Sequence, residues 1–411
     1  MMEKPLTQSE EREEYLCNVC HGIARLCKLN TCPFYRGLLR QNIAAKLRGR
    51  ELGGPSPPTF LVGEKGYPRV ALGSAVVYAD DVNPLLLESP SKWLEFSVDE
   101  LLRLRLSLFL GLTINHVKTP THARGLFTAM QESAASTKPV EIEITTAGTV
   151  NTLPGFSIRT APYGPSARIE KVKLASNVTV PRKVDSYLND PYVKAEEALT
   201  SLYKTGHDEY YLTRLFSAGL LGLARQRKLV PTEWSITAVD DILSKQLYQQ
   251  VKHYSIINEY RVHSYSAVEN SATIILTPTP WMYELLEGWL KYRNNPPYSD
   301  HEILRPRKTY AENTGGAYYA VRLSLLRHLA ERREQSGAIV FFEIKPGWVP
   351  LGVWRFREIV KKALEQRCER FQSPDEALAH IEPRLSIPLH AYIKQSSLIS
   401  FLRKQSTIDM L

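Results

Sequence analysis

Four of the five cysteines in this 411-residue chain fall close together near its N-terminus. They are Cys17, Cys20, Cys27 and Cys32, in the spacing C-x2-C-x6-C-x4-C. Two thiolates two residues apart can bind one metal ion, and a second pair completes a tetrahedron of sulfur ligands. Such a site has no open coordination position, so the metal orders the chain and does not activate water. The spacing therefore predicts a structural zinc module whose folding depends on the metal.

The same four thiolates are also compatible with an iron–sulfur cluster. The pair Cys32-Pro33 matches the end of some ferredoxin ligand runs. Disulfide bonds are less favoured, because nothing in the sequence indicates secretion. We therefore expect zinc as the cofactor and keep the iron–sulfur cluster as the alternative.

The segment around the cysteines is strongly basic. Seven Lys and Arg residues, and no Asp or Glu, lie between Cys17 and Arg50. Arg36, Arg40 and Arg48 belong to this group and are predicted to contact the phosphates of DNA. The alternative is a solvated helical face without a ligand. The net charge of the whole chain, +9, is only a mild bias toward polyanionic partners.

The composition of the whole chain is that of a globular protein. Hydrophobic residues make up 43% and charged residues 23%, which excludes a mostly disordered chain. Because no run of about 18 apolar residues is present, we expect no membrane partner. The acidic N-terminus lacks the apolar segment of a secretion signal. These features predict a cytoplasmic protein.

Hydrophobic periodicity predicts helices and strands in irregular alternation. Helices are expected at 98–110, 192–204, 209–227, 239–252, 281–292, 317–333 and 353–370. Strands are expected at 70–77, 140–145, 168–174, 259–268, 271–276 and 338–344, and the pair 259–268 and 271–276 is expected to form a hairpin. Because strands and helices do not alternate strictly, the expected fold class is α+β, with an N-terminal metal module and a C-terminal helical tail.

Four segments are expected along the chain. Residues 1–50 would form the zinc module with its basic helix, and residues 51–300 an α+β core domain. Residues 301–392 would form a basic C-terminal α/β domain, and residues 393–411 a tail. The Gly- and Pro-rich stretch 49–68 predicts a linker or an extended arm over the surface.

No familiar catalytic motif is present: there is no P-loop, no dinucleotide-binding glycine motif and no H-E-x-x-H. One strand end is a candidate, because Glu343 and Lys345 are two residues apart and project from the same side. In metal-dependent nucleases such an acid holds Mg²⁺ while the lysine contacts the attacked phosphate. Acidic pairs at 80–81 or 240–241 would supply the further ligand. The alternative is a pair that merely ends a strand, so whether the protein is an enzyme stays open.

Basic and aromatic residues interleave in the segment that begins at Trp354. Arg355, Arg357 and Lys361 are predicted to contact DNA, because aromatic groups beside cations can stack bases while the cations hold phosphates. The same segment also has the apolar spacing of a core helix, which would bury Trp354 instead.

The C-terminus carries Gln405, Ile408 and Leu411 at intervals of three residues. This pattern resembles the peptide that docks on sliding clamps. One helical turn of that peptide places apolar side chains in a pocket, and the glutamine hydrogen-bonds beside it. The usual peptide ends in two aromatic residues, which this chain lacks.

Several stretches together resemble the archaeal Nre family of DNA repair proteins, and the likeness covers nearly the whole chain. They are the cysteine cluster with CHG at 20–22 and CP at 32–33, VPTEWSITAVDD at 230–241, GGAYYA at 315–320, WVPLGVW at 348–354 and the clamp-like tail.

The resemblance implies a role in the response to DNA damage, with the sliding clamp PCNA as partner. With the basic segments above, we therefore expect DNA as a second partner and an association with the chromosome. It also implies a four-cysteine metal motif at the positions above and a clamp-binding motif at Gln405, Ile408 and Leu411. It supplies no catalytic residues. Two alternatives stay open, a metal-dependent nuclease acting on repair intermediates through Glu343 and Lys345, and a protein that acts on RNA.

Overall fold

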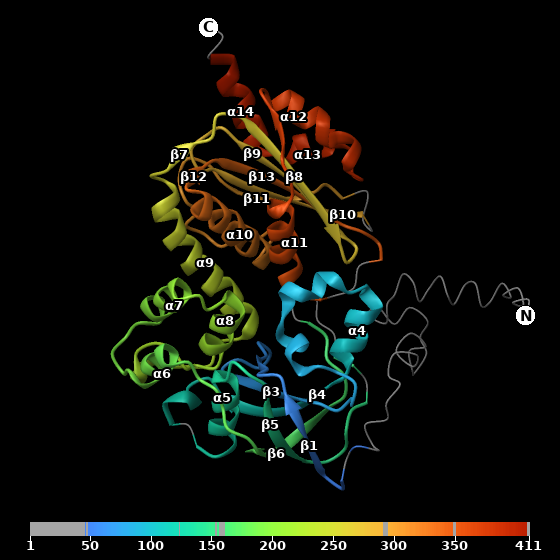
Figure 1. Cartoon of the computed structure of the whole chain (residues 1–411), viewed down its shortest axis with the longest axis vertical. Helices are drawn as coiled ribbons and strands as arrows, with labels where there is room; N and C mark the ends of the chain where they lie inside the picture. The colour runs from blue at the N-terminus through green and yellow to red at the C-terminus, as the bar shows by residue number, and fades with distance from the viewer. Residues whose placement is uncertain are drawn as a thin grey trace, which may run out of the picture. The chain divides into compact units, whose positions relative to one another are not determined.

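The computed structural model describes residues 46, 48–122, 124–152, 154–155, 161–290, 295–347 and 351–408, with side chains as far as residue 404. This part of the chain divides into two compact units. The first consists of the described residues up to 195 with 213–232 and 351–352, and the second of 196–212, 233–347 and 353–408. Each unit contains a six-stranded sheet with helices (Figure 1), so the predicted α+β class is confirmed.

The sheet of the first unit has the strand order β1-β5-β6-β4-β3-β2. Its strands are β1 (Glu51–Ser56), β2 (Phe60–Val62), β3 (Arg69–Val77), β4 (Leu108–His116), β5 (Val140–Thr146) and β6 (Ser166–Leu174). Neighbouring strands are antiparallel, except that β4 and β6 run parallel. The stretch 49–68, for which the sequence predicts a linker or an arm, contributes β1 and β2. It is therefore part of the sheet, because β1 pairs along its length with β5.

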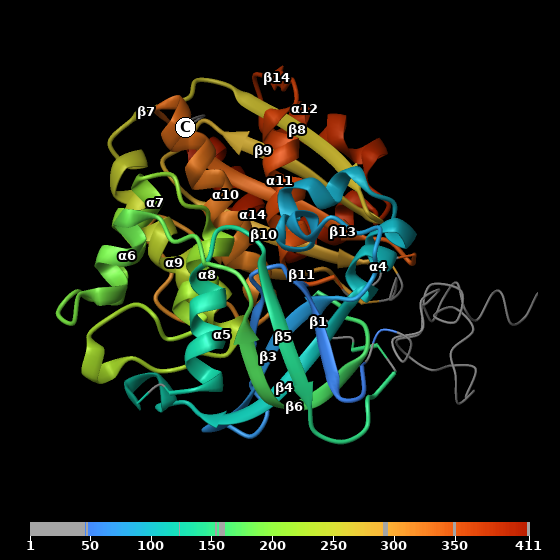
Figure 2. The same ribbon diagram turned by 60° about the horizontal axis from the view of Figure 1, so that its bottom comes forward.

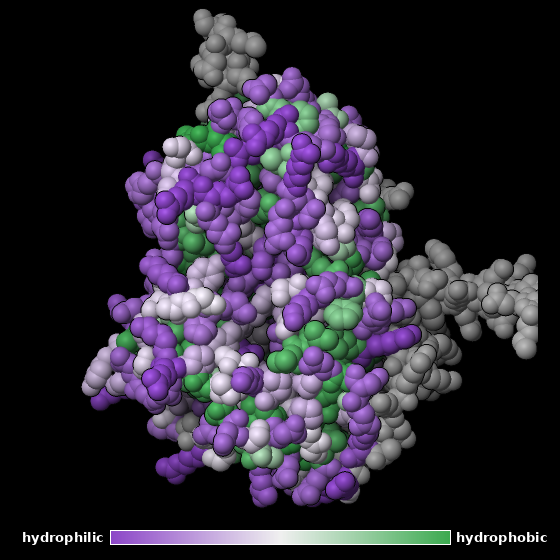
Figure 3. Space-filling model, in the orientation of Figure 1, coloured by the Kyte–Doolittle hydropathy of each residue, from purple (hydrophilic) through white to green (hydrophobic). Residues whose placement is uncertain are grey.

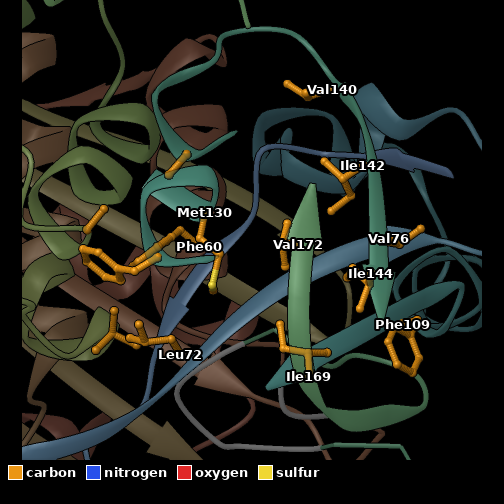
Figure 4. Packing of buried hydrophobic residues seen from close by; sticks show 14 of the residues in the cluster. Phe60, Leu72, Val76, Phe109, Met130, Val140, Ile142, Ile144, Ile169 and Val172 are labelled. Carbon is orange, nitrogen blue, oxygen red and sulfur yellow. The ribbon is translucent and has the colours of Figure 1, made fainter. Parts of the chain in front are cut away.

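One face of this sheet packs against helix α5 (Leu126–Ala135). Side chains alternate between the two faces of a strand, so Val140, Ile142 and Ile144 of β5 all point to the same core. Met130 of α5 lies in this cluster with them (Figure 4). On the other face, Leu108 and Leu110 pack with Leu87 from the 3-10 helix η1 (Pro84–Glu88). The sheet is thus covered on both sides.

The second unit is built on a sheet with the strand order β11-β10-β13-β9-β8-β14. Its strands are β8 (Tyr260–Ala267), β9 (Asn270–Thr277), β10 (Tyr283–Trp289), β11 (Tyr298–Glu302), β13 (Gly337–Ile344) and β14 (Glu369–Phe371). Only β10 and β13 run parallel among these pairs. The predicted hairpin is confirmed as β8 and β9, joined by Val268 and Glu269, both of which have positive φ.

The second sheet lies between two layers of helices. Every residue of β13 is buried, and alternate residues point to opposite layers. Ile339 and Phe341 contact the core formed with α12 (Pro374–Ile381), α13 (Leu389–Gln395) and α14 (Ser397–Ile408). Phe342 stacks on Phe356 of α11 (Trp354–Glu365), with the ring centroids 4.1 Å apart, and α11 packs on α10 (Gly316–Arg332). Burial on both faces explains the uninterrupted apolar run of β13.

The helix predicted at 281–292 is wrong, since this segment forms β10. Its apolar residues have a spacing that also suits a helix. In the structure both faces of β10 are covered, so Leu285 and Leu286 are buried although they point in opposite directions. The two acids of this strand, Glu284 and Glu287, are buried with them and find partners inside the unit.

The remaining elements are α4 (Val98–Leu106), α6 (Arg182–Asn189), α7 (Ala195–Lys204), α8 (Glu209–Ser217), α9 (Thr232–Val251) and the short parallel pair β7 (Ser255–Ile256) and β12 (Glu334–Gln335) (Figures 1 and 2). The boundary expected between residues 300 and 301 falls inside β11. Hydrophilic side chains cover most of the face drawn in Figure 3. In the described part of the chain, none of the helices has the length and apolar character needed to cross a membrane.

Candidate functional site

The predicted metal module lies outside the part of the chain that the structure describes. The residues concerned are Cys17, Cys20, Cys27 and Cys32, with the basic residues Arg36 and Arg40. Leu411 of the predicted clamp-binding motif also lies outside the described residues. Among the described residues, no group of three or more His, Cys, Asp and Glu is placed to hold a metal ion. Zinc binding therefore stays a prediction. Arg48 is described and exposed, just before β1.

Arg357, predicted to contact DNA, is enclosed in the second unit with only 2% of its surface exposed. One of its terminal nitrogens donates to both oxygens of Asp240, at 2.6 Å for Oδ1. Its guanidinium lies 4.8 Å from the ring centre of Tyr210. Burial alone would lower the pKa of Arg357, but the negative charge of Asp240 raises it above its ordinary value. This arginine is therefore a charged core residue.

Glu209 links Arg357 to two further cations. Its carboxylate accepts from Arg327 at 2.6 Å and lies 3.6 Å from Nε of Arg357 and 3.8 Å from Nζ of Lys361. Burial alone would raise the pKa of Glu209, but the three cations outweigh it and lower the pKa to about 2. Lys361 is half-buried and also pairs with Glu358 at 3.0 Å, so its charge is compensated inside the unit.

Arg355, the third basic residue predicted on this helix, is also buried, with 2% of its surface exposed. Its guanidinium lies 4.8 Å from the ring centre of Phe356 and 6.0 Å from that of Trp289. Burial lowers the pKa of Arg355 to about 9, and the neighbouring Glu287 opposes this shift. Burial in turn raises the pKa of Glu287 to about 7. These guanidinium groups face protein, so we do not place DNA contact on Arg355 or Arg357.

The strand-end pair of the nuclease hypothesis does not form an open metal site. Glu343 is 1% exposed, and its carboxylate accepts from the backbone N–H of Ser386 at 2.9 Å and of Ile387 at 2.8 Å. It also accepts from the hydroxyl of Tyr392 at 3.2 Å. The carboxylate thus holds the segment that enters α13. The backbone N–H of Lys345 extends the strand pairing by donating to the carbonyl of Glu269.

A second buried acid, Glu284 on β10, holds the N-terminus of the last helix. Its carboxylate accepts from the backbone N–H of Ser397 at 2.9 Å and of Leu398 at 3.1 Å, and from the hydroxyl of Ser396. The first turn of a helix has N–H groups without intrahelical partners, and it favours negative charge. Glu284, with none of its surface exposed, supplies that charge from inside the sheet.

Apolar contacts fix the same helix along its length. Leu398, Ile399 and Leu402 of α14 are buried in the core that includes Tyr260 and Ile339. The backbone of Gln405 and Ile408 continues in α14, whereas their side chains lie outside the description. The predicted clamp-binding motif therefore begins in the last turns of a helix that is anchored at its start. This anchor is a structural feature that the sequence alone does not reveal.

The sequence reasoning missed Glu284 and Glu209. For Glu284, the available signal was an acid inside an otherwise apolar stretch, YELLEGW at 283–289. A carboxylate in such a position is buried only where several donors meet it. Because those donors come from residues about 110 positions further along the chain, local pattern does not reveal them.

These features define an α+β protein that carries its C-terminal segment on a helix anchored to a sheet by a buried carboxylate. Residues 26–293 match the family model of the archaeal Nre N-terminal region, and residues 302–411 match that of the archaeal Nre C-terminal region. The chain belongs to the archaeal Nre family.

Characterised relatives extend along almost the whole chain. The chain is 36% identical to the DNA repair protein NreA of Archaeoglobus fulgidus over 94% of its own length and 98% of the relative's. It is 33% identical to NreB of the same organism, covering 95% of this chain and 98% of that protein. It is 32% identical to NreA of Haloferax volcanii, covering 87% and 88%. No solved structure matches the chain.

Proposed function

We propose that this protein is a DNA repair factor that binds the sliding clamp through its C-terminal motif and contacts DNA through its basic N-terminal segment. The relatives named above are DNA repair proteins, and they are similar to this chain over nearly its full length. In this proposal the protein works on the chromosome, as a partner of PCNA and of DNA.

The observation that carries the clamp proposal is the anchored α14. A short peptide loses conformational freedom when it binds, and that loss reduces affinity. Here Glu284 and the core residue Leu402 fix the helix whose last turns contain Gln405 and Ile408. A motif that starts from a formed helix has less freedom to lose. This preordering should raise the affinity of the motif for the clamp.

DNA contact is placed on the basic segment between Cys17 and Arg50, with Arg36, Arg40 and Arg48 on the phosphates. Four thiolates with one zinc ion carry a charge of about −2. Of the seven basic residues, Lys46 pairs with Asp80 and Arg50 with Glu170, and the other five still leave the segment positive. Arg355, Arg357 and Lys361 are left out, because their charges are paired or enclosed in the second unit.

The clamp proposal is tested with the full chain and a variant that lacks residues 405–411. Pull-down with the sliding clamp should retain the full chain and lose the truncated one. Fluorescence anisotropy with duplex DNA should give the same affinity for both. A variant with Ser406→Ala and Thr407→Ala changes the residues between the motif positions and should bind the clamp like the full chain. Equal clamp binding by the truncated chain would refute this assignment.

A further inference from the structure

A surface loop of the second unit, residues 303–314, is hydrogen-bonded to two buried acids of the edge strand β11. Oδ2 of Asp300 accepts from the N–H of Asn313 at 3.0 Å and from the N–H and hydroxyl of Thr314 at 2.8 and 3.0 Å. Oε2 of Glu302 accepts from the N–H of Arg307 at 2.9 Å. Asp300 and Glu302 are 1% and 4% exposed. Charge-assisted hydrogen bonds therefore fix the loop at Arg307 and at its C-terminal end.

The middle of the loop is fixed by the side chain of Arg307. It donates to the carbonyl oxygens of Thr309 at 3.1 Å and Tyr310 at 2.9 Å, and it pairs with Asp300 at 3.1 Å. Arg307 thus serves as an internal brace. Leu304, three residues before Arg307, has a φ of +59°, a conformation that is unusual for a leucine.

This braced loop exposes an aromatic ring and two cations. Tyr310 is 52% exposed and stacks on Tyr319, with the ring centroids 5.7 Å apart and the planes at 24°. Arg305 and Lys308 are exposed and have no ion-pair partner among the described residues. Leu304 is 62% exposed. A loop that holds unpaired cations and apolar groups out in solvent is a candidate binding surface.

We propose that residues 304–310 bind unpaired bases of single-stranded DNA, with one base stacked on Tyr310 and the adjacent phosphates held by Arg305 and Lys308. Stacking requires an exposed ring that keeps its orientation, which Tyr319 and the braces provide. Bases in a duplex are stacked on one another and do not offer a free face, so a single strand is the substrate class. This inference rests on the proposed role in DNA repair and goes beyond the clamp and duplex contacts described above.

The test uses the full chain and a labelled oligothymidine in fluorescence anisotropy. Tyr310→Ala should weaken binding by roughly 5- to 100-fold, whereas Tyr310→Phe should bind like the wild type, because stacking needs the ring and not the hydroxyl. The double variant Arg305→Ala and Lys308→Ala should weaken binding and flatten its dependence on salt. Glu312→Gln removes an exposed charge of the opposite sign from the same loop and should not weaken binding.

A second probe isolates the base. With an oligonucleotide of equal charge whose sugars carry no bases, wild type and Tyr310→Ala should bind equally. If Tyr310→Ala binds oligothymidine as tightly as wild type while the circular dichroism spectra agree, the inference is overturned. Tighter binding of the matching RNA would also overturn it as a DNA site. If the wild type binds no DNA at all, the result contradicts the proposed function.

Discussion

Buried carboxylates organise the second unit at the level of single residues. Glu343 and Glu284 each accept from two backbone N–H groups at the start of a C-terminal helical segment. A buried charge is costly unless donors surround it, and these donors come from residues far along the chain, just before α13 and at the start of α14. The acid that suggests a nuclease ligand in the sequence is thus a structural acceptor.

Replacing Glu343 should destabilise the protein without affecting any cleavage of DNA. Glu343→Ala leaves the N–H groups of Ser386 and Ile387 without an acceptor, which should cost about 2–4 kcal/mol. Urea unfolding followed by circular dichroism measures this. Glu365→Ala removes an exposed acid that pairs with Lys362 and should cost less than about 1 kcal/mol. Magnesium-dependent cleavage that disappears in a stably folded Glu343→Ala variant would restore the nuclease hypothesis.

Glu209 predicts a pH dependence of stability. Its pKa falls from 4.5 in the unfolded chain to about 2 in the folded protein. The ionised group therefore stabilises the fold above pH 4.5, and this contribution of about 3 kcal/mol disappears as the pH falls toward 2. The difference in unfolding free energy between wild type and Glu209→Gln should shrink across this interval.

A control for this measurement lies on α10. Glu331 is exposed, and Glu331→Gln should leave the pH profile of unfolding unchanged. A difference between wild type and Glu209→Gln that stays constant from pH 6 to pH 3 would show that the three cations do not act on Glu209 as described.

At the scale of elements, the sheet strands decide how the C-terminal helices are held. Glu284 belongs to β10 and Glu343 to β13, which are parallel neighbours and the second and third strands of the six-stranded sheet. Each sends a carboxylate to the beginning of a different segment, near α14 and near α13. The helices are therefore fixed by their N-termini as well as by apolar contacts, and α14 has a defined start for the tail that follows it.

Loss of the acid on β10 should loosen α14. Glu284→Ala removes the acceptor of the N–H groups of Ser397 and Leu398, so hydrogen exchange in the first turns of α14 should become faster by about tenfold or more. Clamp binding should weaken as well, because the tail would begin from a less ordered helix. Exchange measured by mass spectrometry on peptides that cover 396–404 provides the readout.

Asp375→Asn offers a matched control. Asp375 of α12 pairs with Arg403 of α14 at 3.6 Å, and both side chains are exposed. This substitution should leave exchange in α14 nearly unchanged. If Glu284→Ala exchanged no faster than Asp375→Asn, the apolar contacts of Leu398 and Leu402 alone would account for the position of the helix.

All but one of the helices and strands predicted from local pattern contain an element of the predicted type, and the exception, at 281–292, has a physical cause. Strands β3, β5 and β6 show alternation and α11 shows a helical apolar stripe, so each occurs where it is predicted. Helix α10 also occurs where it is predicted, although every residue from 317 to 326 is buried. Partners on both faces of β10 bury all of its residues except the last. Its sequence therefore shows no clear alternation of apolar and polar residues. Those partners come from elsewhere in the chain.

At the scale of the whole molecule, the metal prediction is tested by analysis of the purified protein. We expect about one zinc ion per chain, bound by Cys17, Cys20, Cys27 and Cys32, and loss of the ion in a Cys20→Ser variant. Binding of duplex DNA should fall with the metal, since the module depends on it for folding. If anaerobic preparations are brown and contain iron, the four cysteines hold an iron–sulfur cluster instead of zinc. Protein without any stoichiometric metal contradicts both assignments.

The sequence by itself determined the α+β class, the central hairpin, most helices and the membership of a DNA repair family, because these depend on periodicity and on motifs that neighbouring residues carry. Only the tertiary structure decided which charges are free. Arg357 and Glu343 have the residue types of binding and catalytic groups, yet both are enclosed, while Arg305 and Lys308 remain exposed on a braced loop. The physical reason is that the state of a charge depends on donors and acceptors brought from distant parts of the chain, which local sequence does not contain.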